Sequence, residues 1–210
     1  MWYNYHMETK KILNFKKFMS TGTLTVFDID ETLFYTTAKI LVKKDNAVIK
    51  SLSNQEFNTY SLKPGESFDF AEFGNAEKFY NESKPINKML DKAKRILNSI
   101  KINPFNKVII VTARANFDNK EKFLDTFRVH GLDIDKIRVE RAGNITDIKN
   151  TAVKKYVIIR NYVMTGQFSR VKLFDDSMEN LVVFLKLKNE FPEVTFEAYF
   201  VEHDGSVKKI

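Results

Sequence analysis

Three short, largely apolar segments stand out along the chain, at residues 24–27, 108–111 and 171–174. Apolar segments of this length are typical of strands that are buried on both faces of a parallel sheet. Two further segments, 136–140 and 194–201, also have the composition of strands. The pattern therefore predicts five strands spread along the chain.

Between these strands the apolar positions recur at the spacing of an α-helix. Residues 85–100 carry such a stripe, and Pro85 suits a first helical turn. Similar patterns predict helices over 120–130, with Gly131 as terminator, over 151–164 and over 177–188. Strands that alternate with helices of this length predict an α/β fold with a parallel sheet and right-handed connections.

Reactive side chains follow three of the predicted strands. Asp28 and Asp30 come after the first, Thr112 ends the second, and Asp175 and Asp176 follow the third. Open parallel sheets bind ligands beyond the carboxyl ends of their strands, so these groups are expected to meet in one site.

The spacing of Asp28 and Asp30 suits a particular chemistry. Side chains two residues apart on a strand share a face, so both carboxylates point at one small volume. Their mutual repulsion favours a bound cation, and a cluster of oxygen ligands suits Mg²⁺. One Asp can then attack phosphorus while the other moves a proton. The alternative is that both are turn or helix-capping residues, and the other polar strand ends argue against it.

A lysine is expected to join these acids from the start of a helix. Asn150 or Thr151 caps that helix, and Lys154 and Lys155 lie in its first turns. Adjacent helical residues point about 100° apart, so only one of the two lysines can face the site. Apolar neighbours favour Lys154, whereas counting four residues from Thr151 favours Lys155.

At this point the chain resembles the haloacid dehalogenase (HAD) superfamily, whose members are mostly Mg²⁺-dependent phosphatases on a Rossmann-like parallel sheet with helices on both faces. Four motifs stand in the order of that superfamily and span residues 23–200. They are Asp28-x-Asp30-x-Thr32, Thr112, a lysine, and Asp175-Asp176.

The resemblance implies a role for each matching residue. Asp28 would be the nucleophile that forms an aspartyl-phosphate, and Asp30 would protonate the leaving oxygen and then activate water. Thr112 would hydrogen-bond the transferring phosphoryl group. Lys154 or Lys155 would neutralise the charge that nucleophile and phosphate share.

The resemblance also implies a metal site and two substrate contacts. Asp175 would ligate Mg²⁺ together with the Asp28 carboxylate and the Asp30 backbone carbonyl, while Asp176 orders the water around the metal. Thr32 and Arg114 are candidate substrate-binding residues. Arg114 either reaches a substrate phosphate or pairs with a local acid, of which Asp118 is the nearest in sequence. Glu31 is a departure, because many members of the superfamily have Gly at that position.

Residues 35–84 interrupt the alternation of strands and helices. We expect an N-terminal extension over 1–22, a core domain over 23–34 and 85–210, and an insertion over 35–84, which the resemblance identifies as a small flap or cap. Asp45 and Asn46 lie between two extended segments, which predicts a β-hairpin. Aromatic residues of the insertion either stack on a substrate base or fill the insertion's own core. They are Phe68, Phe70, Phe73, Phe79 and Tyr80.

Composition limits the class of protein. The chain has 210 residues, 43% of them hydrophobic, which is enough for one good core. No uninterrupted apolar stretch approaches the roughly 18 residues of a membrane span. Without cysteine, disulfides and thiolate chemistry are excluded. Residues 1–17 lack the apolar core of a secretory signal, so a cytoplasmic protein is expected. The formal net charge of +7 attracts anionic substrates or nucleic acid, and it also fits ordinary surface lysines.

The residues and the resemblance together predict a Mg²⁺-dependent phosphomonoesterase, with a nucleotide or a polynucleotide phosphate end as the favoured substrate. The alternatives are a phosphatase for a small metabolite such as a sugar phosphate, a non-catalytic phospho-acceptor, and a nucleic-acid-binding protein. Asp30 argues against the phospho-acceptor, because it would speed dephosphorylation. The clustered acids argue against nucleic-acid binding alone, because unused carboxylates would repel the ligand.

Overall fold

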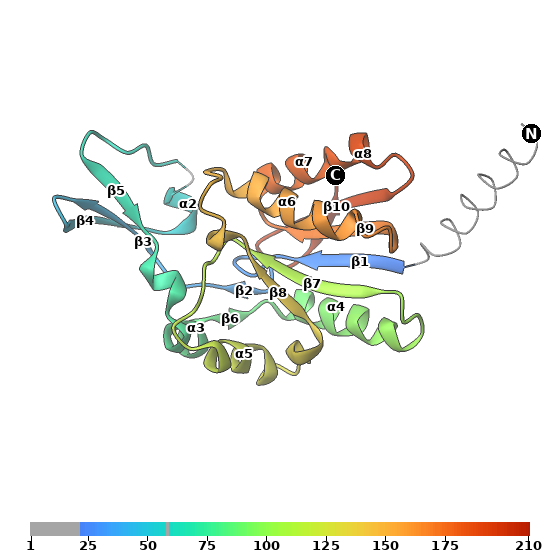
Figure 1. The fold of residues 1–210 in the computed structure, drawn as a ribbon. Coiled ribbons are helices and arrows are strands. Elements are labelled where there is room, and N and C mark those ends of the chain that lie inside the picture. The colour runs from blue at the N-terminus through green and yellow to red at the C-terminus, as the bar shows by residue number, and fades with distance from the viewer. Residues whose placement is uncertain (1–21, 58) are drawn as a thin grey trace, which may run out of the picture.

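The computed structural model describes residues 22–57 and 59–210 and places a six-stranded sheet at the centre of the fold (Figure 1). The strand order is β11-β10-β9-β1-β7-β8, and all neighbours are parallel except β10 and β11. The strands are β1 (Gly22–Phe27), β7 (Lys107–Thr112), β8 (Arg138–Arg141), β9 (Phe168–Asp175), β10 (Thr195–Val201) and β11 (Val207–Lys209). The predicted extension lies outside the described residues except for Gly22, the first residue of β1.

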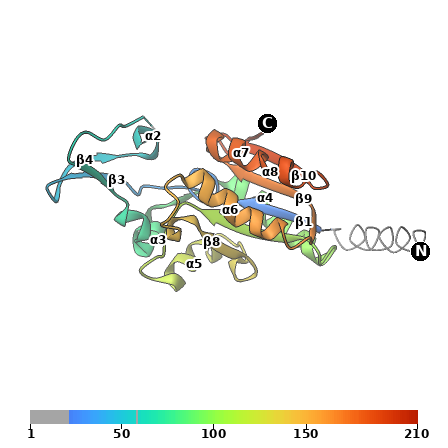
Figure 2. The same ribbon diagram turned by 45° about the horizontal axis from the view of Figure 1, so that its top comes forward.

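Helices cover both faces of this sheet (Figures 1 and 2). One face carries α3 (Ala76–Glu82), α4 (Asn87–Asn98) and α5 (Lys120–Arg128). The other carries α6 (Thr151–Val163), α7 (Met178–Leu185) and α8 (Leu187–Glu190). The prediction of an α/β fold with a mostly parallel sheet is confirmed, and the arrangement is Rossmann-like. Within the described ranges, no helix has both the length and the apolar character that crossing a membrane requires.

Two apolar cores result from the alternation of side chains along the strands. In β7, Val108 and Ile110 pack into the core beneath α4 and α5, whereas Ile109 and Val111 pack into the core beneath α6 and α7. These four side chains are at most 2% exposed, which explains why the strand is apolar at consecutive positions.

Aromatic rings stack across neighbouring strands just before two of the predicted site residues. Phe27 and Phe174 are partners in the register of β1 and β9, and their ring centroids lie 4.9 Å apart at 14°. Tyr199 of β10 continues the stack, 4.6 Å from Phe174 at 9°. The carboxyl ends of three adjacent strands are thereby packed against one another.

Element boundaries differ from the predictions where the chain makes tertiary contacts. Pro85 does not begin a helix but pairs in β6 (Lys84–Pro85) with β2 (Phe34–Tyr35). The Ile86 N–H then donates to the Leu33 carbonyl at 2.9 Å, so the chain stays extended until α4 begins at Asn87. The predicted helix over 177–188 is divided into α7 and α8, and β11 was not predicted.

The insertion forms a separate antiparallel sheet in the order β4-β3-β5, which lies beyond the carboxyl ends of the parallel strands (Figure 1). Its strands are β3 (Ile40–Lys44), β4 (Ala47–Leu52) and β5 (Glu66–Asp69), with the short helix α2 (Asn54–Phe57) beside β4. The predicted hairpin is confirmed, since Asp45 and Asn46 join β3 to β4 with φ of 51° and 64°. Positive φ at both central positions is typical of a tight hairpin turn.

The aromatic residues of the insertion belong to two different cores. Phe68 and Phe73 cover the small sheet, together with Phe57 and Tyr60. Phe79 instead packs on the main sheet against Phe34, Phe123 and Phe127. Part of the segment 35–84 is therefore built into the larger domain.

Candidate active site

The candidate site lies where the strand order changes direction. From β1 the chain continues to β7 on one side, whereas β9 pairs with the opposite edge of β1. Ligands of open α/β sheets bind at such a switch point, beyond the carboxyl ends of the strands. Asp28 directly follows β1 and Asp175 ends β9, and the Asp28 N–H donates to the Phe174 carbonyl at 3.0 Å.

Three carboxylates meet at this point. One oxygen each of Asp28, Asp175 and Asp176 lie within 4.8 Å of one another. Burial raises the pKa of Asp28 above its usual range, with repulsion from Asp175 adding to the effect and Lys155 opposing it. Burial, followed by repulsion from Asp175 and Asp28, likewise raises the pKa of Asp176. The three carboxylates repel one another, so a nearby cation stabilises their ionised forms.

Lys155 supplies a cation to the cluster. Its Nζ lies 2.9 Å from Asp28 Oδ1 and 2.8 Å from Asp175 Oδ2. Burial lowers the pKa of Lys155, but attraction to Asp175 and Asp28 outweighs it and leaves the pKa raised. Lys154 is partly exposed, so Lys155 is the lysine that faces the acids.

The packing of α6 explains why Lys155 rather than Lys154 faces the acids. Its buried residues are Ala152, Lys155, Ile159 and Val163, at intervals of three and four. Asn150 is the N-cap, because its side chain accepts a hydrogen bond from Val153 N at 3.0 Å. Lys155 therefore projects from the same stripe that packs on the sheet, whereas the apolar neighbours that favoured Lys154 are more exposed.

Asp175 is fully engaged by protein groups. Its Oδ1 accepts hydrogen bonds from the Ser177 N–H at 2.9 Å and from Asn180 Nδ2 at 2.8 Å, while Oδ2 bonds Lys155. Sequence reasoning missed Asn180. Its signal is the capped start of α7, where Ser177 is the N-cap and Asn180 lies three residues further on. Among the described residues, Asp175 thus has more hydrogen-bond partners than Asp176.

Asp30 forms an ion pair with Arg114. The partner expected for Arg114 from the sequence is a substrate phosphate or a local acid such as Asp118. Arg114 Nη2 lies 2.6 Å from Asp30 Oδ1, and Nε lies 2.9 Å from Asp30 Oδ2. Asp118 instead accepts a hydrogen bond from Ala76 N at 2.9 Å, at the start of α3. Arg114 is 2% exposed, so its guanidinium is an internal group rather than an open substrate contact.

Two hydroxyls of the predicted set are buried beside these acids. Thr112 Oγ1 accepts a hydrogen bond from the Arg114 N–H at 3.2 Å. Thr32 Oγ1 has no hydrogen-bond partner among the described residues. Glu31, between Asp30 and Thr32, has a φ of 55°, in the left-handed region that favours glycine. Glu31 thus adopts a backbone conformation that glycine, the residue the resemblance leads us to expect at this position, adopts more easily.

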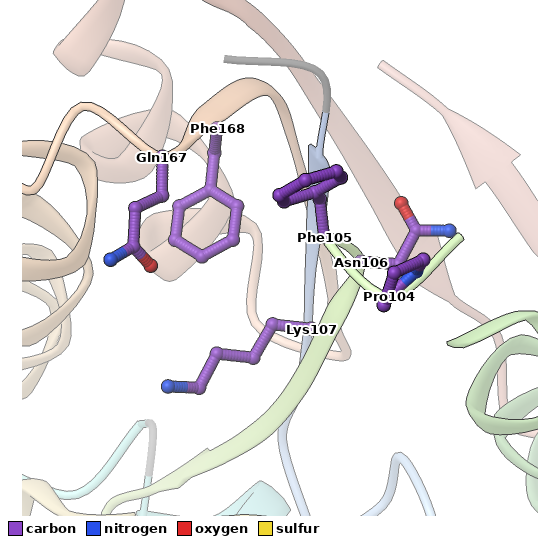
Figure 3. A pocket seen from close by; sticks show the side chains of 6 residues that line it. All are labelled: Pro104, Phe105, Asn106, Lys107, Gln167 and Phe168. Atoms are coloured by element: carbon purple, nitrogen blue, oxygen red, sulfur yellow. The ribbon is translucent and has the colours of Figure 1, made fainter. Parts of the chain in front are cut away.

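A hollow of about 330 Å³ lies elsewhere, at the opposite, amino-terminal edge of the sheet (Figure 3). It is lined by Pro104, Phe105, Asn106, Lys107, Gln167 and Phe168. Lys107 begins β7 and Phe168 begins β9, so this hollow is separated from the acids by the length of the strands. A reactive site needs several convergent polar groups, and these lie at the carboxyl edge.

Most of the predicted residues meet at the carboxyl edge of the sheet. Asp28, Asp175, Asp176 and Lys155 lie together, with the pair of Asp30 and Arg114 beside them. Thr32 and Thr112 are buried next to these groups, whereas Lys154 lies apart. These groups are brought together by the pairing of strands that are distant in sequence. A scan against protein-family models found no matching family, and a search of the curated proteins found no matching relative.

Proposed function

We propose that the chain is a Mg²⁺-dependent phosphomonoester hydrolase of the HAD superfamily that acts through an aspartyl-phosphate. The observation that carries the proposal is the meeting of Asp28, Asp175 and Asp176 around Lys155 at the switch point of the sheet. A buried nucleophilic carboxylate beside a fixed cation is what the transfer of an anionic phosphoryl group requires.

The donor set fits Mg²⁺. Three carboxylates face one ammonium group, so a divalent cation would compensate the remaining negative charge. Asp28 Oδ1 is buried, and Lys155 Nζ at 2.9 Å is the cation that faces it. Because Asp175 is engaged by Lys155, Ser177 and Asn180, Asp176 is the better direct ligand together with Asp28. When bound, Mg²⁺ supplies electrostatic stabilisation of the phosphoryl oxygens.

The side chains then have distinct tasks. A carboxylate oxygen of Asp28 forms a bond to phosphorus as the bond to the leaving oxygen breaks, and Asp30 donates the proton that this oxygen needs. Lys155 balances the charge that develops near Asp28, and it is already in place at 2.9 Å. Because its ammonium group is held from both sides, little reorganisation accompanies the reaction.

We further propose that the insertion is a flap over this site and that the substrate is a nucleotide or a polynucleotide phosphate end. The three-stranded sheet lies beyond the carboxyl edge and is small, which suits an open site (Figure 1). Phe70 is 49% exposed on it and offers a ring on which a base can stack.

A substrate panel tests the substrate class. Nucleoside monophosphates and oligonucleotides with 3′- or 5′-phosphates should give higher kcat/KM than sugar phosphates, and the advantage should shrink with added salt because the net charge is positive. Phe70→Ala should reduce this preference without changing the rate on a small aryl phosphate. Higher kcat/KM on sugar phosphates would contradict the proposed substrate class while leaving the phosphatase assignment intact.

The activity itself is tested with a generic aryl phosphate. The wild-type chain should hydrolyse it with Mg²⁺ and lose the activity in EDTA. Asp28→Asn removes the nucleophile and should abolish turnover, whereas Asp30→Asn should reduce kcat by about 10²–10⁴-fold because a general acid–base group is lost. Asp133, exposed on a distant loop, provides the control Asp133→Asn, which should retain full activity. Hydrolysis that survives Asp28→Asn would contradict the aspartyl-phosphate.

The two adjacent lysines provide a matched pair of variants. Lys155→Met should reduce kcat at least about 100-fold, because the fixed cation next to Asp28 is lost. Lys154→Met should remain within about twofold of wild type, since this side chain is partly exposed and lies on another side of α6. Steady-state kinetics with circular dichroism as a folding check compares them. Equal losses in both variants would contradict the assignment of Lys155.

Metal binding has a readout that does not need activity. At 100 times its Kd, Mg²⁺ should stabilise the folded chain by about 2.7 kcal/mol, a rise in Tm of roughly 5–10 °C. Asp176→Asn should abolish this rise, while Asp133→Asn should keep it. Differential scanning calorimetry at several Mg²⁺ concentrations measures both. A wild-type Tm that does not respond to Mg²⁺ would remove the metal from the proposal.

A further inference from the structure

Arg114 is buried two residues after the end of β7 and makes more contacts than pairing with one acid requires. Its Nε lies 2.9 Å from Asp30 Oδ2 and 3.2 Å from Oδ1, and Nη2 lies 2.6 Å from Oδ1. Nη2 also bonds Thr36 Oγ1 at 2.9 Å, and Nη1 bonds the Phe73 carbonyl at 2.8 Å. All three nitrogens of the guanidinium are thus bonded to parts of the chain that are distant in sequence.

Aromatic rings fix the position of this guanidinium. The rings of Phe73, Phe79 and Phe117 have their centroids 4.9, 4.6 and 5.5 Å from the Arg114 Cζ. Attraction between a cation and aromatic faces is strongest where water is excluded, as it is around a side chain that is 2% exposed. The group is therefore held in one place.

The partners of Arg114 belong to both connections of the insertion to the core. Thr36 directly follows β2, where the chain leaves the core, and Phe73 lies in the short 3₁₀ helix Ala71–Gly74, where it returns. A second contact joins the same two stretches, because the Lys39 N–H donates to Glu72 Oε2 at 3.0 Å. Asp30 is consequently linked through one side chain to both connections.

We infer that Arg114 is a positioning residue that orients the Asp30 carboxyl and couples its position to that of the insertion. The inference rests on the proposed function. A carboxylate offers about four lone-pair directions, and Arg114 occupies two on Oδ1 and one on Oδ2. One direction on Oδ2 is left open. In the proposed reaction a proton passes from this oxygen to the leaving oxygen as the bond from phosphorus to the leaving oxygen breaks and Asp28 bonds to phosphorus.

Two substrates that differ in their need for this proton test the inference. Phenyl phosphate and p-nitrophenyl phosphate share a ring, but phenolate is the poorer leaving group and depends more on the acid. Arg114→Lys keeps a positive charge beside Asp30 yet cannot reach Asp30, Thr36 and Phe73 together. It should reduce kcat/KM for phenyl phosphate about 10–100-fold, and for p-nitrophenyl phosphate only about threefold. Asp30→Asn should show the same selectivity.

Milder variants separate positioning from folding. Thr36→Val removes one bond to Arg114 at nearly constant volume and should shift the ratio of the two kcat/KM values in the same direction, by about twofold or more. Arg138→Gln, at an exposed arginine of β8, should leave the ratio unchanged. Equal losses on both substrates in Arg114→Lys would overturn the inference, because a structural defect alone does not distinguish between leaving groups.

Hydrogen exchange distinguishes this outcome from failure of the proposed function. Backbone amides of residues 36–39 and 71–74 should exchange at least about tenfold faster in Arg114→Lys, while those of α6 should not change. A wild-type chain that hydrolyses neither ester overturns the proposed function and the catalytic role of Arg114 with it. Unchanged exchange in both stretches overturns the coupling to the insertion, whether or not the chain is active.

Discussion

The ion pairing of Lys155 with Asp28 and Asp175 is the constraint on which the site depends. Transferring an ammonium group into a protein interior costs several kcal/mol unless opposite charge is close by. Here two carboxylates lie within 2.9 Å of Nζ, and the three side chains come from α6, β9 and the end of β1. The charges can be buried only if these elements are assembled correctly, so the polar cluster and the fold specify each other.

The same constraint leaves the cluster with more negative than positive charge. The ammonium group of Lys155 is shared between two acids, and Asp176 adds a third with a raised pKa. Arg114 compensates Asp30 separately, through bonds at 2.6 and 2.9 Å. The two aspartates after β1 therefore lie in different electrostatic surroundings although they are two residues apart.

The strands and their polar ends could be predicted because a parallel sheet buried on both faces demands consecutive apolar residues, as at 108–111. The lysine could not be chosen with certainty, because the N-cap at Asn150 and the buried stripe of α6 depend on packing rather than on composition. The partner of Arg114 could not be predicted at all. Asp30 is 84 residues away, and Asp118, the nearest acid in sequence, is used to cap α3.

The stack of Phe27, Phe174 and Tyr199 has a consequence for how accurately the acids are placed. Phe27 is the last residue of β1, Phe174 is the residue before the last of β9, and Tyr199 lies two residues before the end of β10. The ring centroids are 4.9 and 4.6 Å apart. Side chains alternate along a strand, so sliding β1 past β9 by one position would turn Asp28 toward the opposite face of the sheet. It would also separate the stacked rings, which penalises the shifted alignment. The stacked rings therefore favour the observed register of β1 and β9 over a register that is shifted by one residue.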